Sequence, residues 1–340
     1  MLRGAIIGFG RMGLTHFSIL NNHPEVNFVA VCDPSSFLMK NISKYADIET
    51  FQDYRKMIDR MDLDFVIVAT PTGAHAENVR YAVEKGLHVF VEKPFSLNST
   101  QGRELVNLVD GKDLVNQVGY VIRFNDVFLE VKKLLDARAL GDLITFKMEM
   151  HGPTLLKDAK SGWRSKKKEG GGCLYDFASH SIDLINYLVG VPDEVAGSVL
   201  QSIHSVNVED AISSTFLYKN NVRGNLLVNW SEPSYRKPAY KMEIFGRKGK
   251  IIADLHAYKV FFRDEPELSG FNQGWNQCYV TDFVEPVRFY VRGFEFTRQL
   301  DHFIDCIVNK TANKVCTFAD GLKTDTIIER IVEDAAKRRF

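Results

Sequence analysis

Short apolar runs alternate with amphipathic segments through the first third of the chain. Runs rich in β-branched and aromatic residues predict strands, and the segments between them carry apolar residues at the spacing of one helix face. The predicted strands cover residues 2–8, 27–32, 65–69, 88–91 and 114–120. The predicted helices cover residues 11–22, 74–85 and 98–110. This βαβ rhythm predicts a doubly wound parallel sheet with helices on both faces.

The rhythm changes near residue 122. Longer stretches now alternate between apolar and polar residues, which is typical of an antiparallel sheet with one buried face. They cover residues 143–150, 194–204, 211–218, 224–230, 240–245, 250–253 and 259–262. Further helical patterns cover residues 126–137, 174–188, 295–308 and 320–337. We therefore expect an α/β chain of two domains, a doubly wound parallel domain over residues 1–122 and a second α/β domain over residues 123–340.

Composition narrows the classes of partner. The 43 Lys and Arg residues balance 43 Asp and Glu residues, which argues against a protein that coats nucleic acid or binds membranes through basic patches. No stretch approaches the roughly 18–20 apolar residues of a membrane span, and the first apolar run is too short for a secretory signal. Five cysteines without a CxxC pair fit neither a disulfide framework nor a structural zinc site. We expect a cytoplasmic protein with no metal.

A glycine fingerprint follows the first predicted strand. The sequence Gly8-Phe9-Gly10-Arg11-Met12-Gly13 has the form G-x-G-x-x-G and opens an amphipathic helix. In such a turn the first glycine permits the tight bend, the second lets the backbone approach a diphosphate, and the third allows helix and strand to pack closely. The helix N-terminus adds free N–H groups for the phosphates. The pattern predicts dinucleotide binding.

An acidic residue at the end of the next strand predicts which dinucleotide is bound. Asp33 lies 20 positions after Gly13 and would accept hydrogen bonds from the adenosine ribose. Its charge would repel a 2′-phosphate, and the following Pro34-Ser35-Ser36 supplies no arginine to hold one. NAD is favoured over NADP. Asp33 could also cap the helix that follows, and this is compatible with either cofactor.

Two polar clusters are candidates for catalysis. Glu92 and Lys93 end the strand at 88–91, on the edge where open α/β sheets bind ligands, and Lys93 could stabilise negative charge on a substrate oxygen. Asp176, His180 and Asp183 have the spacing i, i+4, i+7 of one helix face. His180 suits proton transfer, and either aspartate could orient its imidazole. A buried structural histidine or a metal site are the alternatives, although no other His/Cys cluster completes a metal site.

The segment 157–172 is rich in lysine and glycine and precedes the Asp–His helix. We expect its three final glycines to give the freedom of a closing segment, with Trp163 covering a sugar face and Arg164 holding a carboxylate or phosphate. Arg123 is a second candidate for anion binding. These residues favour an anionic or nucleotide-linked sugar over a neutral polyol. The alternative is a solvated surface loop whose tryptophan packs on the second domain.

Taken together, these motifs resemble the Gfo/Idh/MocA family. The resemblance is carried by the glycine fingerprint, Glu92-Lys93-Pro94, Arg123-Phe124 and the run from Gly171 to Asp183. It also includes the segment Ala69-Thr70-Pro71-Thr72-Gly73-Ala74-His75. One departure is visible, because many relatives have asparagine at the position of Thr72.

The resemblance implies an NAD(P)-dependent oxidoreductase acting on a secondary alcohol or ketone of a sugar, inositol or nucleotide-sugar. It implies a Rossmann domain followed by a domain with an open, mostly antiparallel sheet that often forms the interface of a homodimer or homotetramer. Lys93, Asp176 and His180 match the family's catalytic positions. Thr70, Pro71, Thr72, His75, Glu92 and Lys93 match positions at the cofactor, and Asp183 is expected near the substrate. The alternative is a non-catalytic NAD(P)-binding regulator of the same fold.

Overall fold

The computed structural model describes residues 1–45, 47–157 and 162–337. The chain divides into two compact units. Unit 1 contains Met1–Val121 and Pro286–Asp325, and unit 2 contains Ile122–Glu285 and Thr326–Phe340. The predicted change of architecture at residue 122 therefore coincides with a change of unit. The expected second domain differs in one respect, because residues 286–325 belong to unit 1.

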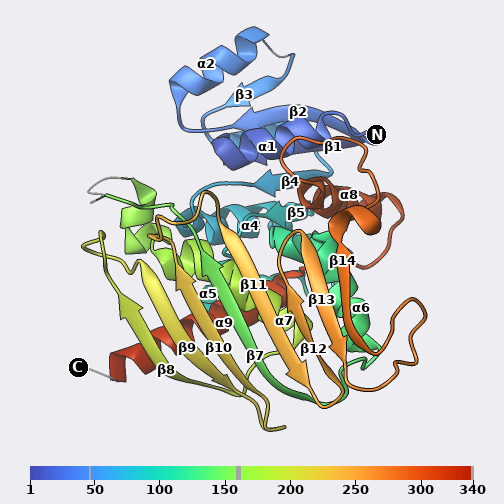
Figure 1. Cartoon of the computed structure of the whole chain (residues 1–340). Helices are drawn as coiled ribbons and strands as arrows, with labels where there is room; N and C mark the ends of the chain where they lie inside the picture. The colour runs from blue at the N-terminus through green and yellow to red at the C-terminus, as the bar shows by residue number, and fades with distance from the viewer. Residues whose placement is uncertain (46, 158–161, 338–340) are drawn as a thin grey trace. The chain divides into compact units, whose positions relative to one another are not determined.

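Unit 1 is built on a parallel sheet with the strand order β3-β2-β1-β4-β5-β6 (Figure 1). The strands are β1 (Leu2–Ile7), β2 (Val26–Cys32), β3 (Glu49–Phe51), β4 (Phe65–Val68), β5 (His88–Val91) and β6 (Asn116–Val118). This is the order of a Rossmann fold, in which the direction of winding reverses between β1 and β4. All residues of β4 are buried, as expected for a strand covered on both faces.

Helices alternate with these strands. They are α1 (Arg11–Leu20), α2 (Ser36–Tyr45), α3 (Tyr54–Arg60), α4 (His75–Glu84) and α5 (Ser99–Val109), with α8 (Phe294–Val308) added from the end of the chain. One hydrophobic cluster joins the sheet to α1 and α8. It includes Phe65 and Phe90 of the sheet with Leu300 and Phe303 of α8, all fully buried. Residues far apart in sequence thus share one core.

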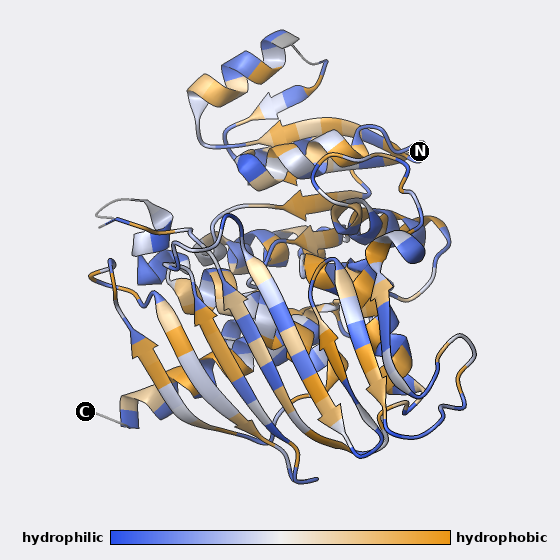
Figure 2. Cartoon of the chain, in the orientation of Figure 1, coloured by the Kyte–Doolittle hydropathy of each residue, from blue (hydrophilic) through white to orange (hydrophobic). Residues whose placement is uncertain are grey.

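Unit 2 is built on a mostly antiparallel sheet with the strand order β14-β13-β12-β11-β7-β10-β9-β8. The strands are β7 (Leu143–His151), β8 (Glu194–Gln201), β9 (Ala211–Leu217), β10 (Arg223–Asn229), β11 (Ala239–Gly246), β12 (Gly249–Ala253), β13 (Ala257–Phe262) and β14 (Gly274–Tyr279). The pair β7–β10 is parallel and the other neighbours are antiparallel. Hydrophobic and hydrophilic residues alternate along these strands (Figure 2). The alternation gives the sheet one buried face and one open face.

Helices cover the buried face. They are α6 (Asp126–Asp136), α7 (Ser179–Leu188) and the later part of α9 (Phe318–Lys337), and the boundary between the units falls inside α9. Phe146, Met148 and Met150 of β7 point into this core, and Trp230 just after β10 is fully buried. The fold class predicted from the hydropathy pattern is confirmed. The short strand β3 and the polar strand β14 were not predicted.

Candidate functional site

The glycine turn joins β1 to α1, and its three glycines meet three different constraints. Gly8 has a φ of +90°, and a side chain there would lie 2.8 Å from the backbone of Ala69. A Cβ on Gly13 would lie 2.0 Å from the carbonyl oxygen of Gly8. A Cβ on Gly10 would meet nothing within 4 Å. The backbone at Gly10 is therefore open to a ligand, and α1 begins without a side-chain cap, so this turn fits the diphosphate of a dinucleotide.

Asp33 follows β2 and contacts the same turn. Its Oδ2 accepts a hydrogen bond from the backbone N–H of Phe9 at 2.9 Å, and its Oδ1 accepts one from Ser35 at 2.9 Å. The carboxylate thus connects the glycine turn to the end of β2. A fixed negative charge at this place supports the expected preference for a ribose hydroxyl over a phosphate.

The turns after β4 and β5 are held together by His75. Its ring is fully buried, with Nε2 2.8 Å from the carbonyl oxygen of Thr70 and Nδ1 2.9 Å from that of Pro94. Burial lowers the pKa of His75, although both carbonyls oppose this. His75 thereby positions two turns that carry sequence-predicted cofactor residues, Thr70-Pro71-Thr72 and Glu92-Lys93. A direct contact between its ring and a cofactor is not what this geometry favours.

Glu92 pairs with a histidine that sequence reasoning missed. His16 of α1 is fully buried, and its Nε2 lies 2.7 Å from Oε1 of Glu92. The other oxygen of Glu92 accepts a hydrogen bond from the backbone N–H of Lys93 at 3.1 Å. Burial alone would raise the pKa of Glu92, but His16 and Lys93 lower it overall. The ionised Glu92 therefore fixes the backbone of the Lys93 turn, and the Lys93 side chain is half-buried.

The Asp–His segment of unit 2 begins with a π-helix over Leu174–Ala178 and continues as α7. This differs from the regular helix that we expected, and the wider turn changes the rotation between Asp176 and His180. Asp176 is buried, and its Oδ2 accepts a hydrogen bond from Nε of Arg164 at 2.8 Å. The Arg164 guanidinium also lies 4.7 Å from the centre of the Trp163 ring. His180 is half-buried in the first turn of α7.

Asp183 has a different partner. Arg123 donates two hydrogen bonds to its carboxylate, at 2.8 and 2.7 Å, and both side chains are buried. The guanidinium also lies 5.1 Å from the centre of the Tyr187 ring. This pair supports the packing of α7. Both arginines that suggested an anionic substrate thus face carboxylates of the chain itself, and binding of a substrate by Arg123, Arg164, Trp163 or Asp183 stays a prediction.

The glycine run at 170–172 is packed rather than free, which corrects our expectation of a flexible closing segment. All three glycines are buried. A Cβ on Gly171 would lie 2.4 Å from the carbonyl oxygen of Arg164, and one on Gly172 would lie 2.4 Å from Oε1 of Glu209. Glycine is needed here so that the turn at Trp163–Ser165 can lie against the start of the π-helix. Residues 158–161 of the predicted loop lie outside the described residues.

Two adjacent acids that the sequence reasoning did not select support this helix start. Glu209 accepts a hydrogen bond from the backbone N–H of Leu174 at 2.8 Å, and its carbonyl accepts one from Cys173 at 2.9 Å. Burial raises the pKa of Glu209. Asp210 is fully buried and accepts hydrogen bonds from the hydroxyl of Ser205 and the indole of Trp230, both at 2.6 Å. The sequence signal was two acids directly before an apolar strand.

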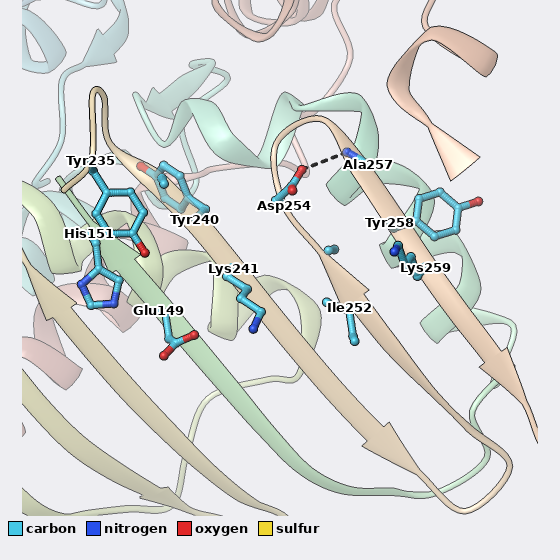
Figure 3. Close-up of a pocket in the computed structure, with 12 residues that line it drawn as sticks. Glu149, His151, Tyr235, Tyr240, Lys241, Ile252, Asp254, Ala257, Tyr258 and Lys259 are labelled. Atoms are coloured by element: carbon cyan, nitrogen blue, oxygen red, sulfur yellow. Dashed lines mark hydrogen bonds between the residues drawn. The ribbon is translucent and has the colours of Figure 1, made fainter. Parts of the chain in front are cut away.

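A cavity of about 270 Å³ lies on the sheet of unit 2 (Figure 3). Its walls come from β7, β11, β12 and β13, with Tyr235 over His151 at a ring separation of 5.4 Å. Lys241 and Glu149 also line it. The walls contain none of the residues predicted for the site, so this cavity is separate from the Asp–His helix.

Across residues 1–45, 47–157 and 162–337, no helix is long and apolar enough to cross a membrane. In the same part of the chain, no three His, Cys, Asp or Glu side chains gather closely enough to hold a metal ion.

Comparison with protein families gives two matches. Residues 2–120 match a model described as the oxidoreductase family with an NAD-binding Rossmann fold. Residues 128–252 match the GFO/IDH/MocA C-terminal domain. Together the two models cover most of unit 1 and most of the sheet of unit 2. The N-terminal match identifies the Rossmann domain as one that binds NAD-type cofactors.

Individual relatives are distant. The chain is 26% identical over 218 residues to scyllo-inositol 2-dehydrogenase (NADP(+)) IolW of Bacillus subtilis, which covers 64% of this chain and 60% of that protein. It is 25% identical over 331 residues to levoglucosan dehydrogenase of Pseudarthrobacter phenanthrenivorans, covering 85% of this chain and 82% of that protein. The chain spans only 60% of the length of the NADP(+)-dependent scyllo-inositol dehydrogenase, and only 54% of the length of scyllo-inositol 2-dehydrogenase (NAD(+)) of the same organism.

Solved structures share the fold over nearly the whole chain. A levoglucosan dehydrogenase in complex with NADH and levoglucosan superposes with a TM-score of 0.85 at 23% identity, covering 99% of this chain and 97% of that one. Identity at this level supports the architecture of both units.

Proposed function

Because the chain belongs to the Gfo/Idh/MocA family of oxidoreductases, we propose that it is an NAD(P)-dependent dehydrogenase or reductase. Its substrate is a secondary alcohol or the corresponding ketone of a sugar, nucleotide-sugar or inositol. The observation that carries the proposal is the glycine turn, where Gly8 and Gly13 are closed by the chain's own backbone and Gly10 is open. The names of the relatives support the class of substrate.

NAD is the proposed cofactor, and NADP is less favoured. Residues 8–13 would hold the diphosphate, and Asp33 would accept the ribose hydroxyls. Thr70, Pro71, Thr72 and Glu92 would line the remainder of the cofactor from the turns after β4 and β5. The relatives include both NAD- and NADP-dependent enzymes, so the preference rests on Asp33.

Three residues carry the proposed chemistry. Bound nicotinamide supplies the hydride acceptor or donor. His180 removes the hydroxyl proton during oxidation and returns it during reduction. The Lys93 ammonium stabilises negative charge on the same oxygen or relays its proton, and Asp176 orients the imidazole.

A substrate panel tests this proposal. Nucleotide-sugars, free sugars and inositols are each incubated with NAD or NADP, and the absorbance of reduced nicotinamide is followed. Turnover with one class supports the dehydrogenase. Tight NADH binding without turnover on any member would instead favour a non-catalytic regulator.

We also propose that the chain forms a homodimer or homotetramer through the open face of the unit 2 sheet. Exposed apolar side chains lie on three strands of this face, namely Leu227 on β10, Phe245 on β11 and Trp275 on β14. A surface of this kind is typical of an interaction site. Light scattering of the wild type and of Phe245→Glu tests the proposal, because a charge at the interface should produce monomers. A monomeric wild type would overturn it.

We propose a cytoplasmic location from the cysteines. All five are free thiols, and four of them are buried. An oxidising compartment would favour paired cysteines, whereas a reducing one maintains free thiols. Fractionation of cells that express the tagged chain tests this.

A further inference from the structure

The turn that carries Lys93 is held at its C-terminal side by two buried side chains. Nδ1 of His75 in α4 lies 2.9 Å from the carbonyl oxygen of Pro94. The backbone N–H and the hydroxyl of Ser96 both donate to Oδ2 of Asp325 in α9, at 2.9 and 2.8 Å. Asp325 and Ser96 are almost fully buried. This side of the turn is therefore fixed by α4 and α9, and neither contact acts on the peptide N–H of Lys93 itself.

The peptide N–H of Lys93 donates instead to Oε2 of Glu92, at 3.1 Å. The carboxylate of Glu92 is enclosed, because a Cβ on Gly119 would lie 3.3 Å from it and Nε2 of His16 lies 2.7 Å from its Oε1. Although burial raises the pKa of Glu92, the neighbouring His16 and Lys93 lower it overall. An ionised carboxylate accepts at both oxygens, so the position of Glu92 determines the position of the Lys93 peptide.

His16 makes its polar contact with this carboxylate. Its ring is fully buried in α1, and its centre lies 5.1 Å from that of Phe90 in an edge-to-face arrangement. Within the parts of the chain that the structure describes, the other ring nitrogen, Nδ1, has no hydrogen-bond partner. A buried nitrogen left unpaired costs stability, and an apolar side chain would avoid that cost. What histidine gains at this position is the contact with Glu92.

We infer that His16 is a positioning residue, which acts through Glu92 to hold the backbone of Lys93 for the chemistry proposed at the Lys93 ammonium. The inference rests on the proposed function and adds a residue to the three that carry its chemistry. Two hydrogen bonds in series connect α1, which begins at the glycine turn, to the lysine. Buried, hydrogen-bonded neighbours keep a catalytic group in its productive geometry, and a displacement of about 1 Å can lower turnover on the order of 10²-fold.

Hydrogen exchange of individual backbone amides, resolved by fragmentation mass spectrometry of the unliganded chain, tests this hold. The side chain of His16→Asn is too short to reach Glu92, so the Lys93 amide should exchange roughly 10- to 100-fold faster than in wild type. The Ser96 amide is the internal control, because its acceptor is Asp325 and its exchange should not change. His16→Gln places an amide nitrogen near the position of Nε2, so exchange at Lys93 should return toward the wild-type rate.

Steady-state kinetics with a substrate from the panel connect this hold to catalysis. His16→Asn should lower kcat roughly 10- to 100-fold, and His16→Gln should restore most of it, while NADH affinity stays within a few-fold of wild type. His23→Asn is the matched control. His23 is also buried, just beyond the C-terminal end of α1, where its ring accepts the backbone N–H of Glu25. This variant should lose stability without faster exchange at Lys93.

Equal exchange at Lys93 in wild type and His16→Asn would overturn the inference. Faster exchange at both Lys93 and Ser96 would show a general loosening of the fold and also overturn it, as would a His16→Gln variant that behaves like His16→Asn. Unchanged kcat despite faster exchange would show that the hold does not serve catalysis. A wild type that neither binds NADH nor turns over any member of the panel would overturn the proposed function, and the exchange result does not depend on that outcome.

Discussion

Unit 1 and unit 2 each contain three closely spaced glycines, and the two groups have opposite surroundings. At residues 8–13 the outer glycines are closed by backbone, and the middle one has nothing within 4 Å of where a side chain would begin. At residues 170–172 all three are buried, and Gly171 and Gly172 lie against Arg164 and Glu209. Glycine content alone therefore does not distinguish a ligand cradle from an internal packing contact. What distinguishes them is the space beside each Cα.

Unit 1 carries the glycine turn proposed for the cofactor, and unit 2 carries Asp176 and His180. The largest expected effect is a loss of turnover that leaves cofactor binding intact. Lys93→Ala and His180→Ala should each lower turnover roughly 10²- to 10⁴-fold, the usual scale of acid–base catalysis. NADH affinity should remain within a few-fold of wild type, because neither residue belongs to the glycine turn. Steady-state kinetics and NADH titration give the two readouts. Near-normal turnover in either variant would remove that residue from the catalytic set.

One alanine substitution in each glycine group compares the two groups directly. Gly171→Ala places Cβ 2.4 Å from the carbonyl of Arg164, and a backbone neighbour cannot move cheaply, so unfolding free energy should fall by about 1–3 kcal/mol. Gly10→Ala meets nothing within 4 Å and has a φ of −72°, so stability should be nearly unchanged. NADH affinity should instead fall at least about tenfold, because the methyl group points where the diphosphate approaches. Urea unfolding and NADH titration of both variants measure these two effects. A large loss of stability in Gly10→Ala, with a loss of NADH affinity only in Gly171→Ala, would contradict the comparison.

A smaller effect concerns the other end of the cofactor. Asp33→Ser combined with Pro34→Arg removes the repelling carboxylate and supplies a cation for a 2′-phosphate. The ratio of NAD to NADP affinity should shift toward NADP by about tenfold or more. Asp33→Asn alone is the control, since it keeps the shape and the contact to Phe9 without adding a cation. A wild type that already prefers NADP would show that the ribose argument is wrong.

The smallest effect is the pH dependence of the acids behind the second glycine group. Because burial raises the pKa of Glu209 above its ordinary value of 4.5, the folded state loses stability as pH rises from 4.5 through the raised pKa. Glu209→Gln should therefore gain a few °C in melting temperature relative to wild type between pH 4 and pH 7. The contribution of Asp210 to stability depends on pH in the opposite direction. Burial opposes its ionisation, but hydrogen bonds led by Ser205 lower its pKa overall, so its contribution is lost below its ordinary value of 3.8. Glu267→Gln, at an exposed position, should show neither effect.

The sequence predicted the parts of the molecule that depend on local pattern. The parallel and antiparallel sheets follow from hydropathy, and the glycine turn and Asp33 follow from spacing within one βαβ unit. The π-helix at Leu174–Ala178 was not predictable, because nothing in its residue spacing differs from an α-helix. The partners of Asp176 and Asp183 were not predictable either. They depend on Arg164 and Arg123, which fold back from 12 and 60 positions away.

The return of residues 286–325 to unit 1 has a consequence for how this chain is made. During synthesis the N-terminal strands and helices leave the ribosome long before α8, yet Leu300, Phe303 and Ile304 complete their shared core. Most of unit 2, Ile122–Glu285, lies between them in the sequence and is synthesised before α8. Until α8 is synthesised, part of the apolar surface of the nascent Rossmann sheet therefore stays exposed. Exposed apolar surface favours aggregation and chaperone binding. A fragment that ends at residue 121 would remain permanently in that state, so the cofactor domain cannot be separated from the chain by a single cut.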